Sequence, residues 1–120
     1  MEIPRELMAS AYSSQGGEAA WSKEDALNVI RWATSSEIAV FGVEVWLPTT
    51  PGPTIPMPFV YTFGWEPYKN ETWLAFVKRA NVGSVEYVDE FEWDPEDVQH
   101  HGMEPFFNLT LDRGKLGGRS

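Results

Sequence analysis

Residues 38–47 read Ile-Ala-Val-Phe-Gly-Val-Glu-Val-Trp-Leu, and this stretch decides the fold. Positions 39, 41, 43, 45 and 47 are all apolar, and the alternate positions are mostly apolar too. A strand that is apolar on both sides is typical of the centre of a sheet. Glu44 is the exception, and a carboxylate among buried neighbours needs a hydrogen-bonding partner. We therefore expect a central strand here, with Glu44 paired.

Two more strands are expected further along the chain. Residues 59–65 alternate and are rich in aromatic and β-branched side chains. Residues 105–111 place three apolar side chains on one face: Phe107, Leu109 and Leu111. The intervening residues 48–58 hold five prolines, which predict a loop or an irregular edge.

The first principal helix is expected over 23–34. Ser22 can accept the hydrogen bonds of a free helix start, and Glu24 and Asp25 place negative charge where the helix dipole favours it. The buried side of this helix is predicted to consist of Ala26, Leu27, Val29, Ile30 and Ala33.

The second principal helix is expected over about 70–91, with Asn70 as its cap. Its apolar residues recur at spacings of three and four: Trp73, Phe76, Val77, Ala80, Ser84, Tyr87, Val88 and Phe91. Gly83 interrupts this pattern at a cost of about 1 kcal/mol relative to Ala. It therefore either permits close packing or marks a local bend.

These elements predict an α+β fold, with about three mostly antiparallel strands packed against two principal helices in a single two-layer domain. A short helix is expected after Pro4. The domain is expected over residues 1–113, and the polar, glycine-rich residues 114–120 are expected to form a flexible C-terminal tail.

The charge of the chain is concentrated in one stretch. The 120 residues include 18 acids and 9 bases, for a formal net charge of −9, and residues 86–104 alone hold eight acids and no Lys or Arg. Large apolar residues alternate with these acids, which indicates a folded surface rather than a disordered acidic tail. A negative field repels phosphate and attracts basic surfaces. We therefore expect no nucleic-acid binding, and a basic protein partner.

Other classes of protein lack sequence support. The chain has no Cys, no basic-then-apolar leader and no apolar run of about 18 residues, so we expect a cytoplasmic protein that does not enter the membrane. His100 and His101 are adjacent and are better explained as a solvated turn than as a metal site with Glu96, Asp97 and Glu104. No metal and no cofactor are expected.

Two alternatives to a protein-binding surface remain open. No nucleophile elbow, phosphate loop or dinucleotide fingerprint is present, so the protein is not expected to be an enzyme. A small hydrolase would have to use a carboxylate pair, for which Glu44 and Glu66 are the candidates. A small-ligand or carbohydrate-binding module would stack its ligand on exposed rings, the candidates being Trp32, Trp46 and Trp65.

The order of several short motifs resembles the immunity protein 40 type of polymorphic-toxin immunity proteins. The motifs are AWSKEDAL at 20–27, VFGVEVW at 40–46, GW at 64–65, ETWLAFVKRA at 71–80 and EYVDEF at 86–91. The chain departs from that pattern at Val43, Glu44 and Gly64, where the family has Gly, Asp and Asn; Glu44 keeps the charge of the family position.

The resemblance implies a small bacterial protein that binds and inhibits a cognate toxin domain. Aromatic anchors and acidic rims are suited to such an interface. The expected contact residues are Glu86, Asp89, Glu90, Glu92, Trp93, Asp94, Glu96 and Asp97, with Trp65 and Glu66 as a second group.

Overall fold

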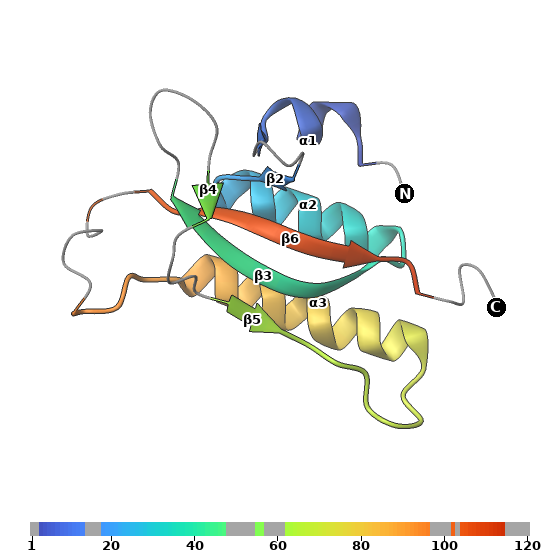
Figure 1. The fold of residues 1–120 in the computed structure, drawn as a ribbon. Coiled ribbons are helices and arrows are strands. Elements are labelled where there is room, and N and C mark those ends of the chain that lie inside the picture. The colour runs from blue at the N-terminus through green and yellow to red at the C-terminus, as the bar shows by residue number, and fades with distance from the viewer. Residues whose placement is uncertain are drawn as a thin grey trace.

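The computed structural model describes residues 3–13, 18–47, 55–56, 62–96, 102 and 104–114. The helices are α1 (Arg5–Ala9), α2 (Lys23–Ser35) and α3 (Trp73–Glu90), and the strands are β1 (Tyr12–Ser13), β2 (Ala19–Ala20), β3 (Ala39–Leu47), β4 (Ile55–Pro56), β5 (Thr62–Gly64) and β6 (Phe106–Asp112). Figure 1 shows α2 and α3 side by side behind one face of the sheet, with β2 and α1 beyond β6. The expected two-layer α+β fold is confirmed.

Strand β3 is the centre of an antiparallel sheet, as predicted. Glu44 pairs both with Asn108 of β6 and with Thr62 of β5, so these two strands lie on opposite edges of β3. Strand β4, two residues long, takes the same edge as β5. The short β4 includes Pro56, in keeping with the irregular edge expected from the prolines.

A β-bulge in β3 changes which side chains share a face. Val40 pairs with Leu111 and Gly42 with Thr110, so Phe41 is an extra residue in the ladder. The unbroken alternation expected from position 39 to 47 is therefore wrong at this point. Val40 instead joins the two valines at 43 and 45 in one core cluster.

The main core lies between this face of the sheet and the two long helices. Its buried members are Trp21, Ala26, Val29, Ile30, Val40, Val43, Val45, Val88, Phe107 and Leu109. The bulged Phe41 packs instead on the first half of α3, with its ring centroid 5.0 Å from that of Phe76. The predicted apolar sides of both helices and of β6 thus face the core.

The two helix starts differ in how well the sequence predicted them. The Ser22 hydroxyl accepts a hydrogen bond from the Asp25 N–H, as expected. Helix α3 begins later than expected, because its cap is Thr72, whose hydroxyl accepts from Ala75 N–H at 3.1 Å. Asn70 is not the cap. It lies in the preceding turn with a φ of 71°, a left-handed conformation that asparagine tolerates better than most residues.

Buried Asn81 on α3 continues the hydrogen bonding of β3 beyond the end of β5. Its Oδ1 accepts from Val40 N–H at 2.8 Å, and its Nδ2 donates to Ile38 O and Thr34 Oγ1, both at 2.9 Å. One side chain therefore joins α3 to β3 and to α2. Sequence periodicity did not single this residue out.

Candidate functional site

The described acids of the 86–96 stretch lie on the last turns of α3 and on the segment after it. All of them are exposed: Glu86, Asp89, Glu90, Glu92, Asp94 and Glu96. Trp93 is half-buried against the main core. Asp97, His100 and His101 fall outside the described residues, so the predictions made for them stay predictions.

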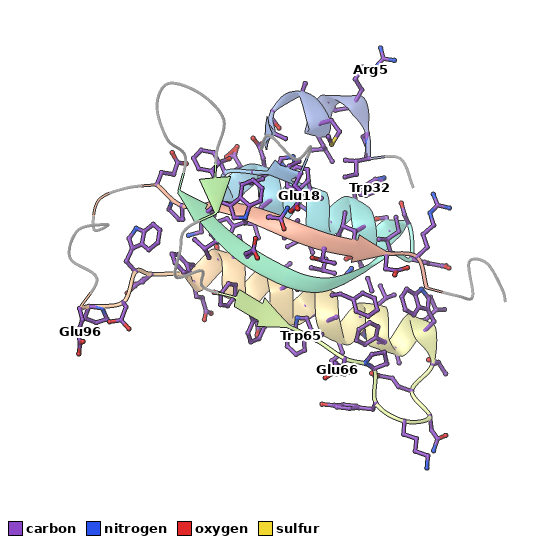
Figure 2. All side chains as sticks on the ribbon, in the orientation of Figure 1. Arg5, Glu18, Trp32, Trp65, Glu66 and Glu96 are labelled. Atoms are coloured by element: carbon purple, nitrogen blue, oxygen red, sulfur yellow. The ribbon has the colours of Figure 1, made fainter. Side chains whose placement is uncertain are left out.

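A groove of about 410 Å³ between β5 and α3 brings together members of the two groups that the sequence singled out. Its half-buried aromatic side chains are Phe63, Trp65, Tyr87 and Phe91. Three exposed carboxylates line it as well: Glu86, Glu90 and Glu92. Figure 2 shows Trp65 beside β5 and α3. The groove is therefore aromatic at its base and acidic where it meets solvent.

The other expected contact residues lie elsewhere. Asp89 lines a separate cavity of about 530 Å³ between α2 and α3. Glu96 lies at the far end of the molecule from Trp65 and Glu66 (Figure 2). Its N–H donates to the Asp94 carboxylate at 2.8 Å, within a turn that follows α3. The acidic stretch is thus spread over several surfaces, and only part of it meets the aromatic groove.

The aromatic base of the groove is a continuous row of packed rings. Trp65 meets Phe63 edge to face at 4.8 Å, and Phe63 stacks on Tyr87 at 4.8 Å with an interplanar angle of 3°. Tyr87 contacts Phe91 at 6.1 Å, and Phe91 contacts the buried Phe107 at 5.8 Å. Such pairs are favourable beyond their buried area. The row ties the groove to the main core and fixes its shape.

Gly83 is needed because the Trp65 ring lies directly on it. A Cβ at position 83 would lie 2.0 Å from Trp65 Cζ2. The indole is also fixed by a hydrogen bond from its Nε1–H to Ser84 Oγ at 3.2 Å. Close packing, one of the two roles expected for this glycine, is confirmed.

Arg79 fixes the segment that leads from Trp65 into α3. It donates to both carboxylate oxygens of Glu71, at 2.8 and 2.9 Å, and to the backbone oxygen of Glu66 at 2.8 Å. Its guanidinium carbon lies 3.8 Å from the centre of the Tyr68 ring. The hydrogen bond from Arg79, followed by that from the Tyr68 N–H, lowers the pKa of Glu71 to about 2.

Within the described part of the chain, the negative charge of the groove is not neutralised by an ion pair. The one salt bridge found there joins Arg79 to Glu71, and none of the described residues that line the groove is Lys or Arg. Carboxylates concentrated in a concave surface raise the local concentration of cations and basic partners. The groove is therefore suited to binding a cationic group.

Glu44 and Trp46 form a structural pair on the other face of the sheet. The indole Nε1–H of Trp46 donates to Glu44 Oε1 at 2.8 Å, which supplies the partner that a half-buried carboxylate needs. Trp46 is 0% exposed, so the suggestion that its ring stacks on a sugar is wrong. Glu66 is exposed, and its backbone oxygen accepts a hydrogen bond from Arg79. Nothing in these contacts joins Glu44 and Glu66 in one acid–base site.

Trp32, the third tryptophan considered for ligand stacking, is half-buried and packs on the margin of the main core. Figure 2 shows it on the side of the molecule that carries α1, away from Trp65. Of the three candidate rings, Trp65 is the one that lines the groove with Glu86, Glu90 and Glu92.

A second pocket, of about 520 Å³, lies at the N-terminal end of α3. Phe41, Trp73 and Phe76 supply most of its apolar wall, and Gly114 closes one side. Gly114, the first residue of the expected tail, packs on Trp73: an added Cβ would lie 2.7 Å from that ring. Residues 115–120 fall outside the described residues.

No group of three or more potential metal ligands comes together among the described residues. In that same part of the chain, no helix is both long and apolar enough to cross a membrane. No protein-family model matches the sequence, and no curated protein matches it either. Function must therefore be argued from the groove itself.

Proposed function

We propose that this protein is an immunity protein that binds and inhibits a basic toxin domain, with the groove between β5 and α3 at the centre of the contact. The observation that carries the proposal is the meeting of Trp65 with Glu86, Glu90 and Glu92 in one groove, whose described lining includes no Lys or Arg. Aromatic anchors in a desolvated pocket supply most of the energy of a protein interface. Surrounding charges mainly set specificity and the rate of association.

The protein would inhibit the toxin by covering its active surface rather than by modifying it chemically. A toxin that acts on nucleic acid needs a basic cleft for phosphate groups, and an acidic surface competes with phosphate for that cleft. Asp94 and Glu96, on the segment that follows α3, are also exposed and add negative charge outside the groove. The proposed site of action is the cytoplasm of the producing cell, where the toxin must be neutralised.

The proposal expects a toxin domain to be encoded next to this protein, and the test is neutralisation of that domain. We expect co-expression to restore growth, and the purified proteins to associate more weakly at high salt than at low salt. The variant Glu86→Gln/Glu90→Gln/Glu92→Gln should lose protection. The control Glu6→Gln/Glu24→Gln/Glu37→Gln also removes three exposed negative charges, so it has the same net charge as the groove variant. This control should keep protection. Equal loss in both variants, or no association at either salt, would overturn the proposal.

A small-ligand-binding module is the second candidate, and the pocket of about 520 Å³ at the start of α3 favours it. Its volume lies within the range of roughly 300–1,000 Å³ usual for small-molecule sites. Its wall includes the rings of Phe41, Trp73 and Phe76. A screen of glycans and small apolar ligands should then change tryptophan fluorescence in the wild type and not in Trp73→Leu. Absence of any such change would remove this candidate.

A further inference from the structure

We propose that the groove between β5 and α3 binds the guanidinium group of a single arginine side chain of the partner. This inference rests on the proposed function, because it names the chemical group that the same groove would recognise.

The carboxylates of the groove favour a cation between them. Glu86 and Glu90 are four residues apart on α3, so they lie on the same side of the helix and repel each other. Glu92, just past the helix end, adds a third charge to the same groove. A bound cation relieves this repulsion and adds charge-assisted hydrogen bonds. A second copy of this chain is a poor occupant because its net charge is also −9.

The rings of the groove favour a planar cation. Trp65 and Tyr87 are half-buried and face the same groove, and their positions are fixed by Phe63, which contacts both. A cation over an aromatic face is attracted by the ring electrons. The guanidinium group is planar and weakly hydrated and can bond a carboxylate with two N–H groups, whereas the lysine ammonium is a compact, strongly hydrated charge. The combination of rings and carboxylates therefore prefers arginine.

The protein already binds one of its own guanidinium groups in this way. Arg79 stacks on Tyr68 at 3.8 Å while both oxygens of the Glu71 carboxylate accept its hydrogen bonds. Trp65 lies beside both places, since the Arg79 guanidinium carbon is 5.8 Å from its ring centre. The groove next to it offers the same two kinds of group, rings and carboxylates, and its lining has no Lys or Arg among the residues that the structure describes.

The volume of about 410 Å³ limits what the groove can accept. This volume falls within the range of roughly 300–1,000 Å³ that is usual for small-ligand sites. A whole protein interface involves many more residues than line this groove. The groove is therefore matched to one anchoring side chain of a larger partner surface, with the remaining acids forming the surroundings.

The test is a titration of the ¹⁵N-labelled protein with three capped tripeptides, Gly-Arg-Gly, Gly-Lys-Gly and Gly-citrulline-Gly, followed by NMR. Citrulline has the shape of arginine without its charge. We expect the arginine peptide to shift the Trp65 indole N–H and the Gly83 amide saturably. The lysine peptide should bind at least fivefold more weakly, and the citrulline peptide should cause no saturable shift.

The groove variant Glu86→Gln/Glu90→Gln/Glu92→Gln should lose these shifts, and the control variant Glu6→Gln/Glu24→Gln/Glu37→Gln should keep them. Dispersed spectra of both variants would establish that each is folded. The inference is overturned if the arginine peptide causes no saturable shift at Trp65, if lysine binds equally well, or if both variants lose the shifts alike.

The two proposals fail in different ways. If the neighbouring toxin domain is inhibited but the arginine peptide leaves Trp65 unchanged, the arginine site is wrong and the immunity function stands. If the peptide saturates the groove and no toxin domain is bound, the immunity function is wrong and the arginine site stands.

Discussion

At the scale of single residues, the contact between Trp65 and Gly83 sets the shape of the groove. The two positions are 18 residues apart, and the sequence around either one does not predict that they are in contact. What the sequence does contain is a glycine inside a strong helical pattern, which costs stability and so indicates a packing role. Which side chain requires that glycine depends on how β5 lies against α3, and this becomes visible only in the folded chain.

This contact predicts a reversal of sign in a double-mutant cycle. Gly83→Ala should destabilise the wild type by about 1–2 kcal/mol, because the new methyl group overpacks against the Trp65 ring. In a Trp65→Ala background the same change should stabilise by up to about 1 kcal/mol, since only the helix preference for alanine remains. Urea unfolding of the four proteins measures both effects. The same sign in both backgrounds would show that the ring does not restrict position 83.

Glu71 gives a pH dependence at the residue scale. Arg79 lowers its pKa from 4.5 to about 2, so the folded state binds this proton less readily than the unfolded state does. The contribution of Glu71 to stability is therefore full above about pH 4.5 and is lost as the pH falls toward 2. The midpoint of thermal unfolding should be higher for the wild type than for Glu71→Gln above that range, and the gap should narrow below it. A gap that is constant across the range would contradict this origin.

At the scale of helices and strands, the sequence predicted which side of each element is buried better than where each element begins. The spacing of apolar residues correctly assigned the buried sides of α2, α3 and β6, because burial of those side chains dominates the packing energy. It misplaced the start of α3, where Asn70 and Thr72 are both acceptable caps and the turn fixed by Glu71 and Arg79 decides between them. It also missed the bulge at Phe41, since strict alternation fits that stretch equally well.

The hydrogen bonds of Asn81 give the prediction that belongs to this scale. Replacing Asn81 with the similarly sized Leu leaves Val40 N–H and Ile38 O buried without a partner, at about 1–3 kcal/mol for each such group. We expect Asn81→Leu to lower the free energy of unfolding by about 2–4 kcal/mol. Amide exchange of Val40 should also become faster relative to Val43, which pairs within the sheet. Unchanged exchange at Val40 would mean that another group supplies the bond.

At the scale of the whole molecule, the candidate site was predicted in part. Acid content and aromatic residues indicated the right segment, and the sequence had already named Trp65, Glu86, Glu90 and Glu92, which the fold brings into one groove. Phe63 was not named, and Gly83 was named for packing and not as part of the groove, because their place in the groove depends on a contact between β5 and α3. Asp89 and Glu96 were grouped with the others by nearness in sequence. The helix turns Asp89 toward the cavity between α2 and α3, whereas Glu96 lies beyond the end of α3 at Glu90.

The arrangement of the groove predicts that its acids and its tryptophan affect different rate constants of toxin binding. The acids act at a distance, so Glu86→Gln/Glu90→Gln/Glu92→Gln should lower the association rate about tenfold at low salt and by less at high salt. Trp65→Ala should mainly raise the dissociation rate, by about 30-fold if the ring is an anchor worth roughly 2 kcal/mol.

The matched control for the ring is Trp32→Ala, which removes another half-buried tryptophan on the opposite side of the molecule (Figure 2). Surface plasmon resonance with the toxin domain at two salt concentrations separates the two rate constants. If Trp32→Ala accelerates dissociation as much as Trp65→Ala does, the effect comes from general loosening of the core, because both rings pack on core clusters and only Trp65 lines the groove. If only Trp65→Ala accelerates dissociation, the anchoring side chain of the partner binds between β5 and α3.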